Sequence, residues 1–205
     1  MPLSLKACEL EIKLHGRVTY AESRGNTWQM THSIDAIDYI LNSVRRGDSN
    51  ALESLYHTLS RPLFAYLRRM GLAPHDADDI VQTVFSRIWL YRESYKGNQG
   101  RAWVYQIARN CLYDLQSTAR SYTEPQEIDA KDFGPEQSLQ ESQMHKRILQ
   151  ALETLPPLSR EAIVLSRFSG LSNSEIAQLL TLTPNNVKVR IHRALAKLKE
   201  ALYDA

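Results

Sequence analysis

The stretch LSNSEIAQLLTLTPNNVKVRIHRALAKLK, residues 171–199, constrains the fold of this chain more than any other segment. Ser172 followed by Glu175 fits a capping box, in which each side chain satisfies an unpaired backbone N–H group at a helix start. Thr183 and Pro184 then supply an N-cap oxygen and a proline at the first helical position, where no N–H donor is needed. The sequence therefore predicts a short helix that begins at the capping box, a tight turn, and a second helix that begins at Pro184.

The second predicted helix has one apolar face and one basic, hydrogen-bonding face. At about 100° per residue, one stripe that must pack inward contains Val187, Ile191, Ala194, Leu195, Leu198 and Leu202. The opposite side carries Asn185, Val189, His192, Arg193 and Ala196, flanked by Lys188, Arg190, Lys197 and Lys199. Such a face suits the DNA major groove, since Arg and Asn can reach base edges while flanking cations hold phosphates. The alternative is a solvated basic surface, but the short helix, tight turn and basic helix together favour a helix-turn-helix.

The composition permits packed cores but excludes a polycationic protein. The chain has 205 residues, of which 43% are hydrophobic, and a formal net charge of +2, so affinity for nucleic acid must come from local clustering of charge. Two cysteines are too few for a disulfide framework or a zinc site, and we expect Cys111 to be a buried, reduced thiol. Because no apolar run resembles a membrane span or a signal core, we expect the chain to lie in the cytoplasm.

Glycines and prolines divide the rest of the chain into segments with helical periodicity. Apolar residues recur at three- and four-residue spacing in residues 37–44, 52–67, 77–88 and 104–115, and none of these segments shows sustained strand alternation. Pro62 is expected to kink or restart the second helix. The sequence thus predicts an all-α protein.

We predict two small helical domains joined by a flexible acidic linker. Residues 121–141 contain two prolines, a glycine and an excess of acidic side chains, which is typical of a solvated tether. Residues 30–120 form one predicted domain and residues 142–205 the other. Residues 1–29 fit neither, and we interpret them as a disordered extension or as the result of a start codon assigned upstream of the true one, Met30.

Three further stretches lead to one family: DADDIVQTVFSRIW (76–89), GRAWVYQIARNCLYDL (100–115) and LETLPPLSREAIVLSRFSG (152–170), which precedes the helix-turn-helix. In this order the motifs resemble the sigma-70 superfamily of RNA polymerase sigma factors, and specifically its compact extracytoplasmic-function (ECF) members. The resemblance extends from about Asp35 to Leu202. It implies a sigma region 2 helical bundle that binds core polymerase and the minus-10 promoter element, and a sigma region 4 helix-turn-helix that binds the minus-35 element.

The resemblance implies that residues 76–89 dock on the clamp helices of the largest polymerase subunit. The matching residues are Asp76, Asp78, Asp79, Gln82 and Phe85. Asp79 and Gln82 share a helical face and can bond Arg and polar partners, whereas Thr83 stands where the family usually has Glu. The aspartates also favour the positive end of the helix dipole, which is the purely structural alternative. A divalent-metal site is a weaker interpretation, since no further carboxylate or His cluster accompanies them.

The resemblance also assigns the minus-10 contacts, in which Asn110 would line a pocket for an unstacked base and the loop 92–99 would contribute further contacts. The residues with suitable polar, cationic or aromatic chemistry are Tyr95, Lys96, Arg101, Trp103, Arg109 and Asn110. Trp103 is equally suited to anchoring a core.

For the minus-35 element, the family's phosphate contacts match Asn173 and Ser174. Its base readers match Lys188, Val189, His192 and Arg193. Asn185 and Asn186 stand where the family often has a glycine, and their amides can read or hydrate bases. Promoter specificity is therefore expected to be individual to this chain.

The sequence predicts a dissociable initiation subunit that helps to melt promoter DNA and is not an enzyme. The six histidines are scattered without a paired base and orienting acid, and we expect no cofactor, metal or small-molecule substrate. The expected partners are core RNA polymerase, at its clamp helices and flap region, promoter DNA, and an anti-sigma factor, which in this family is often membrane-anchored. One rival is a dimeric operator-binding regulator, which would need a strand-containing receiver or ligand domain within residues 35–115. The other is an inactive relative that acts as an interaction protein.

Overall fold

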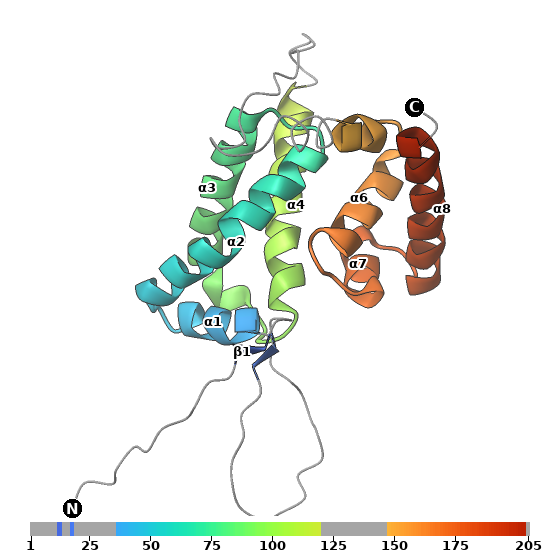
Figure 1. Cartoon of the computed structure of the whole chain (residues 1–205). Coiled ribbons are helices and arrows are strands. Elements are labelled where there is room, and N and C mark those ends of the chain that lie inside the picture. Colours follow the sequence, from blue (N-terminus) through green and yellow to red (C-terminus); the bar gives the residue numbers. More distant parts are fainter. Residues whose placement is uncertain (1–11, 14–16, 19–35, 120–146, 204–205) are drawn as a thin grey trace, which may run out of the picture.

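The computed structural model describes residues 12–13, 17–18, 36–119 and 147–203 (Figure 1). Two short strands, β1 (Ile12–Lys13) and β2 (Arg17–Val18), pair antiparallel with Ile12 opposite Val18. From residue 36 onward the described residues form helices and their connecting turns, which confirms the all-α prediction. The predicted acidic linker and most of the N-terminal extension lie outside the described residues.

Four α-helices and a short 3-10 helix form the N-terminal group. They are α1 (Ala36–Arg45), α2 (Ser49–Arg69), α3 (Pro74–Leu90), η1 (Arg92–Ser94) and α4 (Gly100–Ala119). The Asp48 carboxylate caps α2 by accepting hydrogen bonds from two backbone N–H groups, and Pro74 starts α3 where no donor is required. Each helix turns its apolar stripe inward, so that side chains such as Leu41, Leu63 and Val84 are almost fully buried.

Pro62 lies inside α2, and the helix does not restart there. A proline in a helix interior costs about 3 kcal/mol relative to alanine, because an N–H donor is lost and the ring crowds the preceding turn. Leu59 and Leu63, on either side of Pro62, are both buried in the core. Packing of one continuous apolar stripe therefore offsets the local penalty. Of the two expected outcomes, a kink or a restart, the restart is wrong.

The C-terminal group contains the predicted helix-turn-helix. Residues 147–153 are helical and precede α6 (Pro157–Arg167), α7 (Asn173–Leu180) and α8 (Pro184–Tyr203). Both hydrogen bonds of the capping box between Ser172 and Glu175 are present, and Thr183 Oγ1 accepts the third-residue N–H of α8. Thr181 has a left-handed φ of 56° and makes the sharp turn between α7 and α8. Both predicted helix starts are confirmed.

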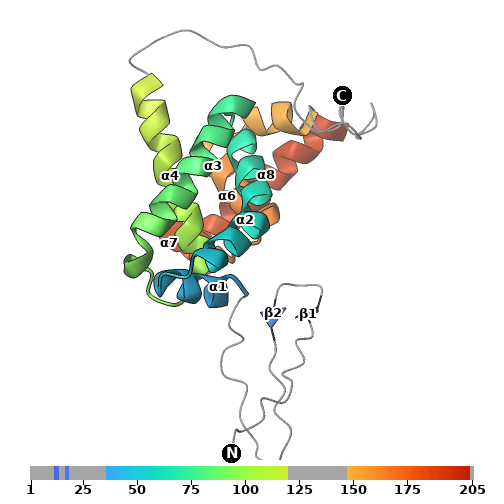
Figure 2. The same ribbon diagram turned by 90° about the vertical axis from the view of Figure 1, so that its left-hand side faces the viewer.

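The two groups pack against each other around a continuous apolar core. Buried residues of both groups belong to one cluster, in which α6 contacts α2 and α7 contacts α4. The two views show α6 and α7 beside the N-terminal bundle, with α8 on the far side of them (Figures 1 and 2). One side of α4 therefore faces the C-terminal group.

We expect Leu63→Ala to lower the free energy of unfolding by about 2–5 kcal/mol, because Leu63 is 0% exposed and its truncation leaves a cavity in the core. Urea unfolding followed by circular dichroism measures the change. Arg61→Ala, on the exposed side of the same helix, is the control and should change stability by less than about 0.5 kcal/mol. Equal effects of the two variants would contradict the packing described for α2.

Candidate nucleic-acid and polymerase interfaces

The basic face of α8 is open to solvent, whereas its apolar stripe is buried in the first half of the helix and partly buried at Leu195, Leu198 and Leu202. Val187, Ile191 and Ala194 are at most 7% exposed. The predicted minus-35 residues of this helix are all exposed, namely Asn185, Asn186, Lys188, Val189, His192 and Arg193. Asn173 and Ser174, at the start of α7, are also exposed. The fold thus presents a cationic, hydrogen-bonding helix face of the kind that enters a DNA major groove.

Asn186, one residue of this face, is already hydrogen-bonded within α8. Arg190 Nε donates to Asn186 Oδ1 at 2.9 Å, across one helical turn. This bond fixes the orientation of the Asn186 amide beside the exposed Val189. While this bond is made, Asn186 Oδ1 is occupied by Arg190, so the amide can face a base edge only in the orientation that the bond permits.

The outer side of α3 forms a second candidate surface, which combines acidic, polar and apolar groups. A shallow depression on it is lined by Asp79, Gln82, Thr83, Ser86, Arg87 and Leu90. Asp79 also lies 3.5 Å from exposed His75, one helical turn away. Leu90 is 67% exposed and Tyr91 is 53% exposed, so this side of the bundle offers apolar contact area next to hydrogen-bonding groups.

The five predicted polymerase contacts are not equivalent in the structure. Asp78, Asp79 and Gln82 are exposed, and Asp76 is half-buried in the first turn of α3. Phe85 is 6% exposed and packs with its ring 4.9 Å from the ring of Tyr56. Sequence reasoning missed Leu90 and Tyr91. Both side chains are exposed to solvent, whereas the Phe85 side chain is buried.

The loop that precedes α4 is anchored by Asp38 of α1. One carboxylate oxygen of Asp38 accepts hydrogen bonds from the Tyr95 hydroxyl, at 2.6 Å, and from the Gly100 backbone N–H. A Cβ atom on Gly100 would lie 2.6 Å from the same oxygen and from a Leu41 methyl group, so this position has room only for glycine. Tyr95 is 2% exposed and is therefore a core residue that holds the loop.

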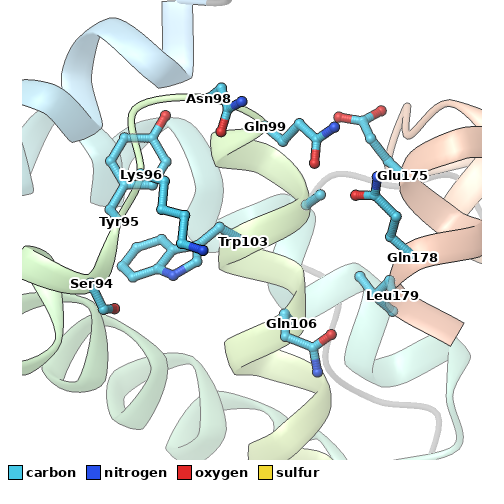
Figure 3. A pocket seen from close by; sticks show the side chains of 11 residues that line it. Ser94, Tyr95, Lys96, Asn98, Gln99, Trp103, Gln106, Glu175, Gln178 and Leu179 are labelled. Atoms are coloured by element: carbon cyan, nitrogen blue, oxygen red, sulfur yellow. The ribbon is translucent and has the colours of Figure 1, made fainter. Parts of the chain in front are cut away.

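Three of the six predicted minus-10 residues, Tyr95, Lys96 and Trp103, line a groove between the start of α4 and the C-terminal group. The groove has a volume of about 270 Å³, and its lining includes Lys96, Gln99, Trp103 and Gln106 on one side and Glu175, Gln178 and Leu179 of α7 on the other. Lys96 lies beside the Trp103 indole, and Gln99 points toward Glu175 across the groove (Figure 3). The Tyr95 ring lies 5.3 Å from the Trp103 ring, between their centroids. Trp103 thus has one side in the bundle and one side in the groove.

Two further predicted minus-10 residues contact the C-terminal group directly. Arg109 Nε donates to Glu161 Oε1 at 2.9 Å, and Arg101 donates to the Ser169 carbonyl oxygen at 3.4 Å. Asn110 is exposed, and its Oδ1 accepts a hydrogen bond from Gln106 Nε2 at 2.9 Å. The C-terminal group therefore covers Arg101 and Arg109 in part, whereas Asn110 is open to solvent.

Glu161 of α6 is the buried acidic residue of this contact. Its side chain is 0% exposed, and it accepts hydrogen bonds from Arg109, Tyr66 and Tyr113. Burial and the neighbouring Glu161 carboxylate raise the pKa of Tyr66 well above its usual value, and the same two causes raise the pKa of Tyr113. Both phenols therefore keep their protons near neutral pH and act as donors.

Sequence reasoning missed Glu161 and Asp38, which hold the predicted minus-10 residues Arg109 and Tyr95 in place. Each is a lone acidic residue in an amphipathic helix, and helical periodicity predicts an exposed position for most such residues. Their partners lie 48 to 95 residues away for Glu161 and 57 to 62 residues away for Asp38. Such pairings are visible only in the tertiary structure.

Other chemistries find little support in the described part of the chain. Among the described residues, no group of three His, Cys, Asp or Glu side chains could hold a metal ion. Cys111 is buried as expected, and burial raises the pKa of its thiol. Within the same residues, the helices are too short or too polar to cross a membrane.

Comparisons with known proteins agree with this architecture. The family descriptions "Sigma-70 region 2" and "Sigma-70, region 4" match residues 55–122 and 145–198. The ECF RNA polymerase sigma factor SigD of Mycobacterium bovis is 32% identical over 190 residues, covering 86% of this chain and 88% of SigD. The ECF sigma factor SigE of Mycolicibacterium smegmatis is 32% identical over 140 residues, covering 65% of this chain and 54% of SigE, so the match spans about half of that relative.

Solved structures give the same result. CnrH in complex with the cytosolic domain of CnrY has a TM-score of 0.65 and 27% identity, and the match covers 82% of this chain and 97% of that one. The sigma factor RpoE in complex with the anti-sigma factor NepR, from Bartonella quintana, has a TM-score of 0.59 and 25% identity. The match covers 73% of this chain and 95% of that one.

The fold and the two family matches define a sigma-70 type RNA polymerase sigma factor, a DNA-binding transcription regulator. Within that class, the chain belongs to the extracytoplasmic-function (ECF) sigma factors, which bind RNA polymerase and recognise promoters. The resemblance noted in the sequence is thus confirmed.

We expect Tyr95→Phe to loosen the loop before α4. The variant keeps the buried ring but removes the hydroxyl that donates to Asp38, a loss of about 1.5 kcal/mol for a hydrogen bond to a charged group. Hydrogen–deuterium exchange of residues 95–100 should become faster. Tyr91→Phe is the matched control, since Tyr91 is 53% exposed, and unchanged exchange in both variants would contradict the anchoring role of Asp38.

Proposed function

We propose that this sigma factor brings core RNA polymerase to promoters with a minus-35 and a minus-10 element and helps to melt the DNA between them and the start site. The observation that carries the proposal is the exposed basic face of α8 in a helix-turn-helix whose opposite, apolar face packs through the buried residues Val187, Ile191 and Ala194. Charge on that face is held in a fixed geometry, as readout of base edges requires. We assign no enzymatic step, cofactor or metal to the chain and expect it to work in the cytoplasm.

For the minus-35 element we assign base contacts to α8 and phosphate contacts to the start of α7. Lys188, His192 and Arg193 are the charged or titratable readers, and Val189 offers an apolar contact to a thymine methyl group. Asn173 and Ser174 lie at the positive end of α7, where their exposed backbone and side-chain donors suit a phosphate. Asn185 and Asn186 add side-chain amides, each with a donor and an acceptor, so their hydrogen bonds should favour particular base sequences.

For core polymerase we assign the outer side of α3 as the surface that meets the clamp helices. Asp78, Asp79 and Gln82 supply exposed acceptors for basic and polar partners, while Leu90 and Tyr91 supply apolar contact area. Phe85 supports this surface from the core and does not lie on it. A contact of the C-terminal group with the flap region completes the proposed attachment.

For the minus-10 element we assign the exposed amide of Asn110 and the groove residues Lys96 and Trp103. Arg101 and Arg109 of α4 supply positive charge next to the C-terminal group, which both contact. An unstacked base needs a polar group for its edge, a flat surface for its face and cations for the neighbouring phosphates, and these residues provide each of them. Tyr95 serves by holding the loop through Asp38.

We assign residues 30–120 and 142–205 to two functional domains, with residues 121–141 as the tether. An anti-sigma factor is the proposed regulator, because the similar chain RpoE is found in complex with the anti-sigma factor NepR, and CnrH is found in complex with the cytosolic domain of CnrY. A dimeric operator-binding regulator is less well supported, since residues 36–119 form helices and turns in place of a receiver domain.

Run-off transcription from fragmented host genomic DNA tests the proposed function. Core RNA polymerase with this protein should yield discrete transcripts that core polymerase alone does not, and their start sites should share two spaced upstream elements. Intact core binding without new transcripts would instead indicate an inactive or inhibitory relative. Loss of core binding altogether would contradict the proposal.

Substitutions on the two exposed surfaces should separate the two binding activities. Arg193→Ala is expected to weaken promoter binding by about tenfold, since a good base contact contributes about 1–3 kcal/mol, and to leave core binding unchanged. Asp79→Ala with Gln82→Ala should weaken core binding and spare the minus-35 contact. Pull-down on core polymerase and promoter binding by the assembled holoenzyme measure the two effects. Equal loss of core binding in both variants would contradict the assignment.

A further inference from the structure

We propose that Arg190 and Asn186 act as one donor-only reader, which selects a G·C pair in the minus-35 element. Arg190 is the positioning residue of this pair, because its guanidinium holds the oxygen of the Asn186 amide and leaves the amide NH2 group for DNA. The inference rests on the proposed function, since it places α8 in a major groove. It adds the base pair that Asn186 selects and a role for Arg190, which matched none of the family's base readers.

Asn186 lies at the end of α8 that meets base edges in a helix-turn-helix. It is the third residue of the helix, and its backbone N–H group donates to Thr183 Oγ1 at 3.2 Å. Asn186 is exposed, whereas Arg190, one turn further on, is half-buried. Recognition helices contact base edges mainly with their N-terminal residues. Asn186 therefore lies within reach of bases, on a backbone whose start is fixed.

The orientation of the Asn186 amide follows from the chemistry of its partner. Arg190 Nε donates to Asn186 Oδ1 at 2.9 Å. A guanidinium has N–H donors and no acceptor, so the amide can face it only with its oxygen. An asparagine amide without such a partner turns easily about its last torsion, because that torsion has a broad, roughly two-fold preference. Arg190 thus directs the Asn186 Nδ2 donors away from itself.

A fixed NH2 group changes which base an asparagine can read. In the major groove, adenine presents an acceptor, N7, beside a donor, its N6 amino group, and a free asparagine amide matches both. Guanine presents two acceptors, N7 and O6. Because Asn186 Oδ1 already faces a cation, an adenine amino group would meet the donors of Arg190 at that oxygen. The guanine edge meets no such conflict, so the pair favours G·C over A·T.

The surroundings of the pair favour acceptors as well. Asn186, Val189, Arg190 and Arg193 lie three or four residues apart along one stripe of α8. Two arginines in that stripe make its potential positive, which attracts the N7 and O6 edge of guanine. Water is partly excluded from a major groove that a helix fills, so the bond between Arg190 and Asn186 gains strength there. The amide hence keeps its orientation at the base edge.

Side-chain NMR of the free chain tests the bond itself. Exchange of the Arg190 Nε–H proton with water should become about twofold faster in Asn186→Ala, because a bond between surface residues one turn apart has a small favourable free energy. Asn185→Ala is the matched control, since it removes the neighbouring exposed amide and should leave the exchange unchanged. An unchanged Arg190 signal in Asn186→Ala would overturn the inference.

Sequence selection by the holoenzyme tests the base that the pair reads. Promoters found by run-off transcription are randomised within the minus-35 element, and the bound fraction is sequenced. The position read by Asn186 is the one at which Asn186→Ala loses the preference of the parent chain. There the parent chain should prefer G·C over A·T by about tenfold.

Two variants of α8 separate the positioning role of Arg190 from its charge. Arg190→Met removes the guanidinium and keeps an apolar stem of similar length, and it should abolish the G·C preference or turn it toward A·T. Lys197→Met is the control for charge, because Lys197 is an exposed cation of the same helix. Its loss should weaken binding to all sequences alike and leave the G·C preference unchanged.

The outcomes separate this inference from the proposed function. Enrichment of two promoter elements with A·T preferred at the Asn186 position, or with a G·C preference that Arg190→Met leaves unchanged, would overturn the donor-only reader and keep the sigma factor function. If Asn186→Ala changes no position, Asn186 reads no base and the inference is overturned as well. If the holoenzyme enriches no common sequence, the proposed function fails and the inference falls with it. If Arg190→Met loses helix content by circular dichroism, Arg190→Ala decides in its place.

Discussion

The relative position of the two helix groups depends on the burial of one carboxylate. Glu161 enters the boundary between the groups with no exposed surface, and Tyr66, Arg109 and Tyr113 satisfy it from the other side. An apolar contact alone would tolerate sliding and rotation, because hydrophobic burial has no direction. Three hydrogen bonds to one carboxylate define a single arrangement, and the groove along α4 follows from it.

This arrangement divides the molecule into surfaces with different availability. The basic face of α8 and the acidic side of α3 are open, whereas Arg101 and Arg109 of α4 are partly covered by the C-terminal group. A DNA-binding subunit with open cations everywhere would be held on nonspecific DNA, since phosphate contacts act on any sequence. A nearly balanced net charge and a covered cationic surface both oppose that outcome.

Much of the fold could be predicted from local rules. The capping box at Ser172, the Thr183–Pro184 helix start and the buried stripe through Val187 and Ile191 all appear as the periodicity requires. Continuity of α2 through Pro62 could not be predicted, because packing on both sides outweighs the local penalty. In the candidate sites, the resemblance assigned Asp79 and Phe85 to one surface, although Phe85 packs in the buried apolar stripe of α3 and only Asp79 is exposed.

The sequence by itself determined the helices, their inward faces and the order of motifs that identifies an ECF sigma factor, because these depend on residues three or four positions apart. Only the tertiary structure decided that Asp38 anchors the loop before α4 and that Glu161 faces Arg109. Those pairings join residues more than 50 positions apart. Burial makes these hydrogen bonds necessary, because a buried charge without partners is strongly unfavourable, and no local pattern records which residues become neighbours when the helices pack.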